Sequence, residues 1–212
     1  MAKGSGFERE MCKELSLWVT SQMRDDVFWR TPGSGARATT RMKQMRETMD
    51  AAGDMMSTAI YSKPYTTLAI WEFKRGYGGG GKKKKRAPSS SVDPLSILDN
   101  PLTAKHDALL LKWWRKLSKE KAEHARRYSF LIFKRDRKDK CIVMDDYTFK
   151  FIERQNGPLG GKSRFHVFVN NYNIVILRLD DFLKWCHPQR TFGGQRFIKR
   201  RKKKRIIKRR KI

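Results

Sequence analysis

The chain has 212 residues, which is long enough for one globular domain with a sizeable core. Its 49 Lys and Arg residues outnumber 21 Asp and Glu residues, and the resulting formal charge of +28 argues against an isolated enzyme for small neutral substrates and implies a polyanionic partner. We expect no membrane association, because no segment approaches the ~20 apolar residues that a transmembrane helix needs.

Three cysteines, Cys12, Cys141 and Cys186, lie far apart and form no Cys-x-x-Cys pair. An odd number at this spacing indicates neither a disulfide framework nor a zinc knuckle. We therefore expect reduced, mostly buried thiols and a cytoplasmic location.

A helix and three strands are predicted in the first part of the chain. Apolar residues in the segment 7–23 follow helical spacing, at Phe7, Met11, Leu15 and Trp18, with Cys12 and Val19 beside them. Ser5 is a candidate N-cap for this helix. The strands are predicted over residues 27–31, 55–61 and 66–75.

The remaining elements follow a Gly- and Lys-rich loop at residues 76–93, whose composition cannot bury a core. We predict a helix over 109–125, a hairpin of strands 128–133 and 141–144, strands 165–169 and 174–179, and a helix over 180–186. This order predicts an α/β fold with a mixed β-sheet flanked by helices. We divide the chain into a core at 1–146, an accessory region at 147–195 and a basic extension at 196–212, which is either disordered or binds DNA.

The strand that ends at Arg75 carries the first candidate site. Because side chains alternate along a strand, Glu72 and Lys74 share one face, while Trp71 and Phe73 share the other. A surface ion pair would have the same Glu-x-Lys pattern, but this is the one such tripeptide in the sequence, and it ends an apolar strand. A carboxylate and a lysine in this position are suited to metal-assisted phosphodiester hydrolysis.

Two further carboxylates fit the same site. Asp54 opens the preceding strand, where antiparallel pairing would bring it toward Glu72. Glu8 falls within the apolar arc of the first helix, where a carboxylate needs a metal, a cation or a hydrogen-bond partner. The alternative for Glu8 is a favourable interaction with the helix dipole.

Four segments of the chain now form an ordered set of motifs. They are Phe7-Glu8-Arg9-Glu10, Arg30-Thr31-Pro32-Gly33-Ser34-Gly35, Gly53-Asp54 and Trp71-Glu72-Phe73-Lys74. In this order they resemble the PD-(D/E)xK nuclease superfamily, and most of all the archaeal-type Holliday junction resolvases and the small endonucleases of bacteriophage genomes. The resemblance is close over about the first 75 residues and looser to about residue 145. It implies a restriction-endonuclease-like fold with an αβββαβ core.

The resemblance also implies roles for individual residues. Asp54 and Glu72 would ligate Mg²⁺, for which Mn²⁺ would substitute, with the Phe73 carbonyl as a further ligand. Glu8 would bind a metal-coordinated water or a second ion, and Lys74 would orient the attacking water. Arg30 and Ser34 would contact the scissile phosphate or its neighbour, although simple turn chemistry would also explain Ser34.

Basic residues outside these motifs are expected to bind DNA through its phosphates in a salt-sensitive way that ignores sequence. They are Arg37, Arg41, Lys43, Lys82, Lys83, Lys84, Lys85, Arg86, Lys202, Lys203, Lys204 and Arg205. A solvated basic face is the alternative for the group at Arg37 to Lys43. The tail could also serve as a nuclear address or lie on anionic lipid.

The sequence thus predicts a Mg²⁺-dependent DNA endonuclease, which the resemblance places in a phage, acting in the bacterial host cytoplasm. Branched DNA and recombination intermediates such as Holliday junctions are candidate substrates, and flaps, nicks and plain duplex stay open. Resolving a junction by two symmetric cuts would require a homodimer. Two alternatives remain open: a non-enzymatic nucleic-acid-binding protein that retains the nuclease fold, and an RNA-processing nuclease.

Overall fold

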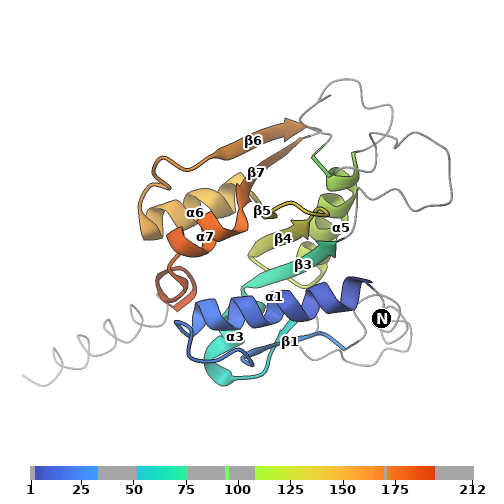
Figure 1. Ribbon diagram of the computed structural model, residues 1–212. Coiled ribbons are helices and arrows are strands. Elements are labelled where there is room, and N and C mark those ends of the chain that lie inside the picture. The colour runs from blue at the N-terminus through green and yellow to red at the C-terminus, as the bar shows by residue number, and fades with distance from the viewer. Residues whose placement is uncertain (1–2, 33–51, 76–93, 96–107, 170, 194–212) are drawn as a thin grey trace, which may run out of the picture.

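The computed structural model describes residues 3–32, 52–75, 94–95, 108–169 and 171–193 (Figure 1). It is a mixed α/β structure, as the sequence predicts. A five-stranded mixed sheet has the strand order β3-β4-β5-β7-β6, and a two-stranded sheet pairs β1 with β2.

The elements occur along the chain in this order: α1 (Lys3–Val19), β1 (Phe28–Arg30), β2 (Met55–Ser57), η1 (Ile60–Ser62), α3 (Lys63–Thr67), β3 (Ala69–Arg75), α5 (Leu109–Glu123), β4 (Tyr128–Lys134), β5 (Lys140–Asp145), α6 (Asp146–Asn156), β6 (Arg164–Val169), β7 (Tyr172–Arg178), α7 (Leu179–Trp185) and η3 (Gln189–Gly193). No helix in the described part of the chain is long and apolar enough to cross a membrane.

The five-stranded sheet separates two hydrophobic cores. Strand β3 runs parallel to β4, and every other neighbouring pair in this sheet is antiparallel. Helices α1, α6 and α7 contribute buried residues to the core on one face, and α5 contributes to the core on the other face. Because α5 connects two parallel strands, it has to cross over the sheet, and it packs against both β3 and β4.

The structure confirms the predicted hairpin as β4 and β5, and the later strands as β6 and β7. The strands of residues 164–178 join the same sheet as β3, so the region beyond residue 146 extends the sheet. Helix α6 was not predicted. Its signals were present, since the Asp145 carboxylate caps it by accepting a hydrogen bond of 2.6 Å from the Thr148 N–H, and Phe149 and Ile152 are buried one turn apart.

Two predicted strands are shorter than expected. The strand predicted at 55–61 ends at Ser57, because serine hydroxyls bind nearby carbonyls and divert the backbone into η1. The strand predicted at 66–75 begins at Ala69. Pro64 lies in the first turn of α3, where its fixed φ favours a helix, and the short helix occupies residues 63–67.

The bounds of the first helix also differ from the prediction. Helix α1 begins at Lys3, so Ser5 lies inside its first turn and is not its N-cap. The helix ends at Val19, four residues earlier than predicted. The Thr20 hydroxyl donates to the Ser16 carbonyl at 2.8 Å and accepts from the Arg24 N–H at 3.0 Å, and Ser21 and Gln22 have positive φ values of 53° and 72°. These contacts turn the chain out of the helix.

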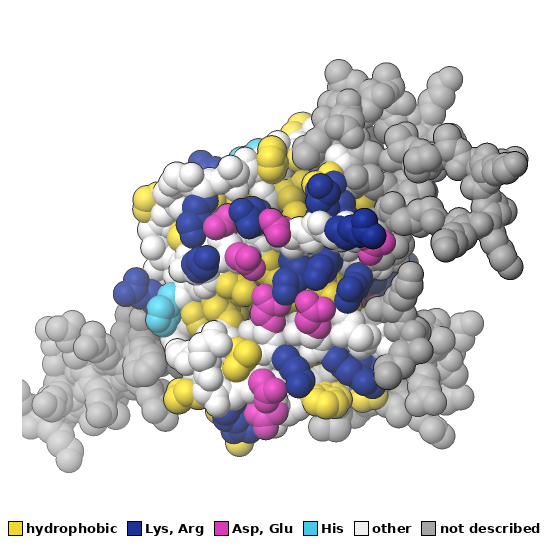
Figure 2. Space-filling model, in the orientation of Figure 1, with side chains coloured by type: hydrophobic (Ala, Val, Ile, Leu, Met, Phe, Trp, Pro, Cys, Tyr) yellow, Lys and Arg dark blue, Asp and Glu magenta, His cyan; other side chains and the backbone are white. Residues whose placement is uncertain are grey.

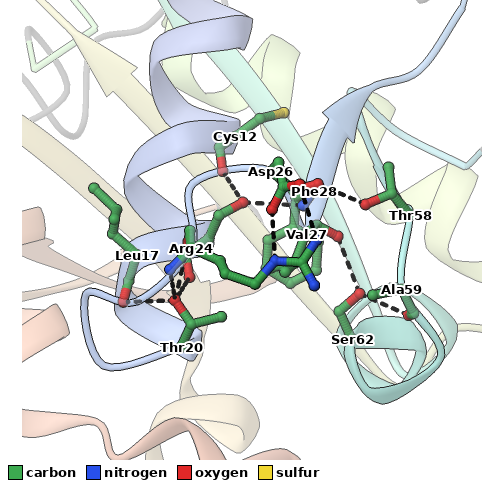
Figure 3. Close-up of polar contacts among 11 residues, drawn as sticks. Cys12, Leu17, Thr20, Arg24, Asp26, Val27, Phe28, Thr58, Ala59 and Ser62 are labelled. Atoms are coloured by element: carbon green, nitrogen blue, oxygen red, sulfur yellow. Dashed lines mark hydrogen bonds and ion pairs between the residues drawn. The ribbon is translucent and has the colours of Figure 1, made fainter.

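A buried serine joins α1 to β1. The Ser16 hydroxyl donates to the Cys12 carbonyl at 2.7 Å and accepts from the Phe28 N–H at 2.9 Å. The Val27 carbonyl, next to Phe28, accepts a hydrogen bond of 3.0 Å from the Ser62 hydroxyl (Figure 3). These bonds fix the start of β1, the strand that ends in Arg30.

Replacing Ser16 with alanine should lower the free energy of unfolding by about 1–3 kcal/mol, because the buried Phe28 N–H loses its acceptor. Urea denaturation measures this change. Ser118, half-buried in the middle of α5, provides the matched control: Ser118→Ala should change stability by less than about 0.5 kcal/mol. Equal losses in the two variants would contradict the role of the Ser16 hydroxyl.

Candidate active site

The side chains of β3 alternate between the two faces of the sheet, as the sequence predicts. Trp71 and Phe73 are buried in the core beneath α1, and Ile70 is buried in the core beneath α5. Glu72 and Lys74 therefore face the α5 side, where only 4% of Glu72 is exposed. The ammonium of Lys74 forms an ion pair with the Glu72 carboxylate. The end of β3 thus holds a buried acid and a lysine on the same face.

Asp54 is fixed against β3 by two hydrogen bonds. Its backbone N–H donates to the Trp71 carbonyl at 2.7 Å, and its carboxylate accepts from the Phe73 N–H at 2.7 Å. Its own carbonyl accepts from the Thr31 N–H at 3.1 Å, which links β3 to the end of β1. The structure therefore brings Asp54 to Glu72, although through these single contacts and not through a continuous β2–β3 ladder.

Gly53 permits this close approach. Its φ is +75°, and a Cβ atom at this position would lie 2.4 Å from the Trp71 carbonyl oxygen and 3.0 Å from a side-chain carbon of Ile70. A side chain would clash with the backbone of β3 and would also strain the backbone of residue 53. The Gly53-Asp54 pair is therefore a packing requirement of the site.

Gly53→Ala should destabilise the protein by about 2–4 kcal/mol and displace Asp54 from β3. Gly160 has a similar φ of +74°, and a Cβ atom there would have no neighbour within 4 Å, so Gly160→Ala tests backbone strain alone. We expect the smaller loss, about 1 kcal/mol, in that control. Thermal and urea unfolding measure both variants, and a Gly53→Ala loss no larger than the control would refute the close-approach argument.

Glu8 lies on α1 beside the buried residues Phe7 and Cys12, in agreement with its predicted place on the apolar face. Its side chain is 14% exposed and pairs with the Arg30 guanidinium, which extends from β1. The resemblance implies a phosphate contact for Arg30. In the structure its Nε atom donates to the Glu8 carboxylate, so the two predicted site residues contact each other.

Ion pairs hold α1 in place next to the site. Glu10 lies 3.5 Å from the Arg75 guanidinium at the end of β3 and 3.5 Å from the Lys140 ammonium on β5, and Glu14 also pairs with Lys140. Figure 2 shows acidic and basic side chains interspersed on the face of the molecule that includes α1. These contacts fix Glu8 relative to β3, since α1 is joined to both β3 and β5.

Burial and charge repulsion shape the protonation of the site. Burial and, to a smaller extent, the nearby Glu72 carboxylate raise the pKa of Asp54 from 3.8 to about 7, while Lys74 opposes the shift. Burial would lower the pKa of Lys74, but the Glu72 and Asp54 carboxylates outweigh it and the net shift is upward. Lys74 is therefore charged at neutral pH, whereas Asp54 titrates near it.

The raised pKa of Asp54 predicts a pH dependence of stability. The folded protein binds this proton more tightly than the unfolded chain, so the ionisation of Asp54 removes stability as pH rises from about 4 to 7. Asp54→Asn abolishes this contribution. Without divalent ions, the variant should gain stability relative to the wild type as pH increases across that range. Urea denaturation at several pH values measures the difference, and a constant difference would show that burial of Asp54 does not shift its pKa.

The oxygen atoms available at the site suit a hard cation that takes few ligands from the protein. Asp54 and Glu72 offer carboxylate oxygens, and Phe73, whose carbonyl is the implied further ligand, follows Glu72 and contacts Asp54 through its N–H. Mg²⁺ in proteins is commonly bound by one or two carboxylates and retained waters. Within the described ranges, no group of three or more His, Cys, Asp or Glu side chains is arranged to hold a metal ion. The two buried carboxylates therefore fit Mg²⁺ with waters, but not an all-protein cage.

Two residues at the site, Lys116 and Glu120, were not predicted from the sequence. Lys116 on α5 places its ammonium 3.6 Å from the Glu72 carboxylate and 3.3 Å from that of Glu120. The available signal was the apolar stripe of α5, since Lys116 lies between the buried Trp113 and Leu117. That signal could not distinguish Lys116 from the other α5 lysines, because the register between α5 and β3 is set by tertiary packing.

The predicted phosphate contact at Ser34 and the predicted DNA contacts fall outside the described residues. The DNA contacts are Arg37, Arg41, Lys43, the segment Lys82 to Arg86 and the segment Lys202 to Arg205. The loop at 76–93 and the extension at 196–212 lie outside them too.

No family model matches the chain, and no match was found among the curated proteins or the solved structures.

Proposed function

We propose that the protein is a Mg²⁺-dependent endonuclease that hydrolyses phosphodiester bonds in DNA, with a PD-(D/E)xK-type site. One observation carries the proposal: the buried Asp54 carboxylate is bonded to the Phe73 N–H, next to the buried Glu72 and with Lys74 on the same strand, in a chain with a charge of +28. Two buried acids repel each other unless a cation lies between them. Such acids repel phosphate, so they do not themselves help a protein to bind DNA.

The order of elements supports the proposal. Helix α1, strands β1, β2 and β3, helix α5 and strand β4 occur in the αβββαβ order that the resemblance to PD-(D/E)xK nucleases implies, with η1 and α3 inserted between β2 and β3, and β4 runs parallel to β3. Strands β1 and β2 depart from that pattern, because they pair with each other in a separate two-stranded sheet. Glu8 comes from α1 and Asp54 from the residue before β2, while Glu72 and Lys74 come from the end of β3.

The reaction adds water across one P–O ester bond. Mg²⁺ held by Asp54 and Glu72 would supply a hydroxide-like nucleophile and neutralise developing charge. Lys74 orients the water oxygen that attacks phosphorus and stabilises the negative charge on the pentacoordinate phosphate. Arg30, which pairs with Glu8, would contact a neighbouring phosphate. The water loses a proton, and the leaving oxygen gains one as its bond to phosphorus breaks.

The proposal extends to the substrate, the oligomeric state and the origin of the protein. We propose branched DNA as the preferred substrate, a homodimer that makes two symmetric cuts, and a phage origin with activity in the bacterial host cytoplasm. The positive residues outside the described ranges would hold the DNA through its phosphates.

Cleavage assays test the proposal directly. The wild type should cut end-labelled DNA with Mg²⁺ or Mn²⁺ and not with EDTA, and Glu72→Gln and Lys74→Met should each reduce the rate at least ~100-fold while DNA binding persists. Glu123→Gln, which removes an acid at the exposed end of α5, is the matched control and should cut normally. Four-way junction, flap, duplex, single-stranded DNA and RNA substrates in parallel determine the preferred substrate.

A second function has one observation in its favour. Lys74 and Lys116 both pair with Glu72, so this buried carboxylate has cationic partners among the protein's own side chains. A non-enzymatic nucleic-acid-binding protein that retains the nuclease fold could keep the acid for these contacts alone. Such a protein would bind every substrate in a salt-sensitive way and cut none with either metal ion. That outcome would remove the nuclease proposal.

A further inference from the structure

Helix α5 presents a second lysine to the proposed site. The Lys116 ammonium lies 3.6 Å from Oε1 of Glu72, the same oxygen that pairs with Lys74. The two lysines differ in exposure: the side chain of Lys74 is 21% exposed and that of Lys116 is 60% exposed. Lys74 therefore approaches Glu72 from within the protein, and Lys116 approaches it from the solvent side, where a substrate would enter.

We propose that Lys116 contacts the substrate phosphate during hydrolysis and that Glu120 positions it. This inference rests on the proposed nuclease function and extends it by one substrate-binding residue and one positioning residue. Neither Lys116 nor Glu120 belongs to the four motifs on which the resemblance to PD-(D/E)xK nucleases rests.

Charge balance explains why Lys116 would act on phosphate. Without a bound cation, one Glu72 oxygen is shared by two ammonium groups. If Glu72 held a divalent cation, both lysines would be repelled from that carboxylate, and the exposed Lys116 would have room to move because its four-carbon stem is flexible. An incoming phosphate provides the negative charge that Lys116 would then contact, at a non-bridging oxygen next to the metal.

Glu120 keeps Lys116 close to the site during this exchange. Its carboxylate lies 3.3 Å from the Lys116 ammonium, one turn along α5, and its side chain is only 26% exposed. The Glu120–Lys116 contact does not include Glu72. It would therefore still restrain Lys116 if Glu72 held a cation. Phosphate would thus meet a lysine whose position is already restricted, which reduces the entropy lost on binding.

The chain offers a matched control on the same helix. Lys119 and Glu123 form the same i,i+4 ion pair at 3.8 Å, but their side chains are 79% and 42% exposed. Substitutions in this pair change the net charge and helix contacts in the same way without altering a group at Glu72. A larger effect on cleavage of substitutions in the Lys116–Glu120 pair than in the Lys119–Glu123 pair is therefore due to the contact of Lys116 with Glu72.

Single-turnover cleavage with Mg²⁺ should fall roughly 30- to 300-fold in Lys116→Gln and stay within about twofold in Lys119→Gln. Lys116→Arg keeps the charge and should restore the rate to within about tenfold of the wild type. DNA affinity in EDTA should change less than about threefold in each variant, because one phosphate contact is removed among many. Melting temperatures within about 2 °C of the wild type establish that the variants fold.

A double substitution tests the role of Glu120. Glu120→Gln should slow cleavage about 3- to 10-fold in the wild type and have no further effect in Lys116→Gln, because a positioning residue acts through the residue that it holds. Additive losses would overturn the positioning role.

The outcomes distinguish failure of the Lys116 role from failure of the nuclease proposal. If the wild type cuts DNA and Lys116→Gln cuts as fast as Lys119→Gln, the role of Lys116 is wrong and the nuclease stands. If the wild type cuts no DNA with Mg²⁺ or Mn²⁺, the nuclease proposal fails and the role of Lys116 fails with it.

Discussion

The hydrogen bonds between Asp54 and β3 are the constraint on which the site depends. They hold a carboxylate from the chain before β2 against the edge strand of the main sheet, at the position where Glu72 also faces inward. Gly53 makes the approach possible, and Thr31 continues the contact to β1. Two acids from separate segments are thereby buried together, and this arrangement is unfavourable for the folded protein unless positive charge compensates it.

Basic side chains from several elements supply that positive charge. Lys74 and Lys116 both pair with Glu72, and Arg30 pairs with Glu8 on α1. These ammonium and guanidinium groups still leave Asp54 with a pKa of about 7, so the described protein groups do not fully stabilise its carboxylate in the ionised form. A divalent cation would complete the compensation, since it can contact both acids at once while a lysine forms its shortest contacts with one.

The sequence predicted those parts of the structure that depend on local pattern. The period of two along β3 put Glu72 and Lys74 on one face, and helical spacing put Glu8 on the buried side of α1, because both depend on backbone geometry alone. Lys116 could not be found in this way. Its contact with Glu72 depends on how α5 crosses the sheet, and α5 has several lysines with equivalent local surroundings. The strand ends near Ser57 and Pro64 were also misjudged, since hydroxyl contacts and a short helix replaced extended chain there.

The overall charge and the local charge of the site act at different distances. The positive charge of the chain draws a polyanion over nanometres, but at ~4 Å an uncompensated carboxylate would repel a phosphate by about 4 kcal/mol at an effective dielectric constant near ~20. Long-range attraction therefore cannot by itself place a phosphate at Asp54 and Glu72. The sign of the field must reverse locally, and in a nuclease the bound cation would do this, with Lys74 and Lys116 then free to contact the phosphate instead of the acid. The same two lysines would thus stabilise the protein before a metal binds and the substrate afterwards.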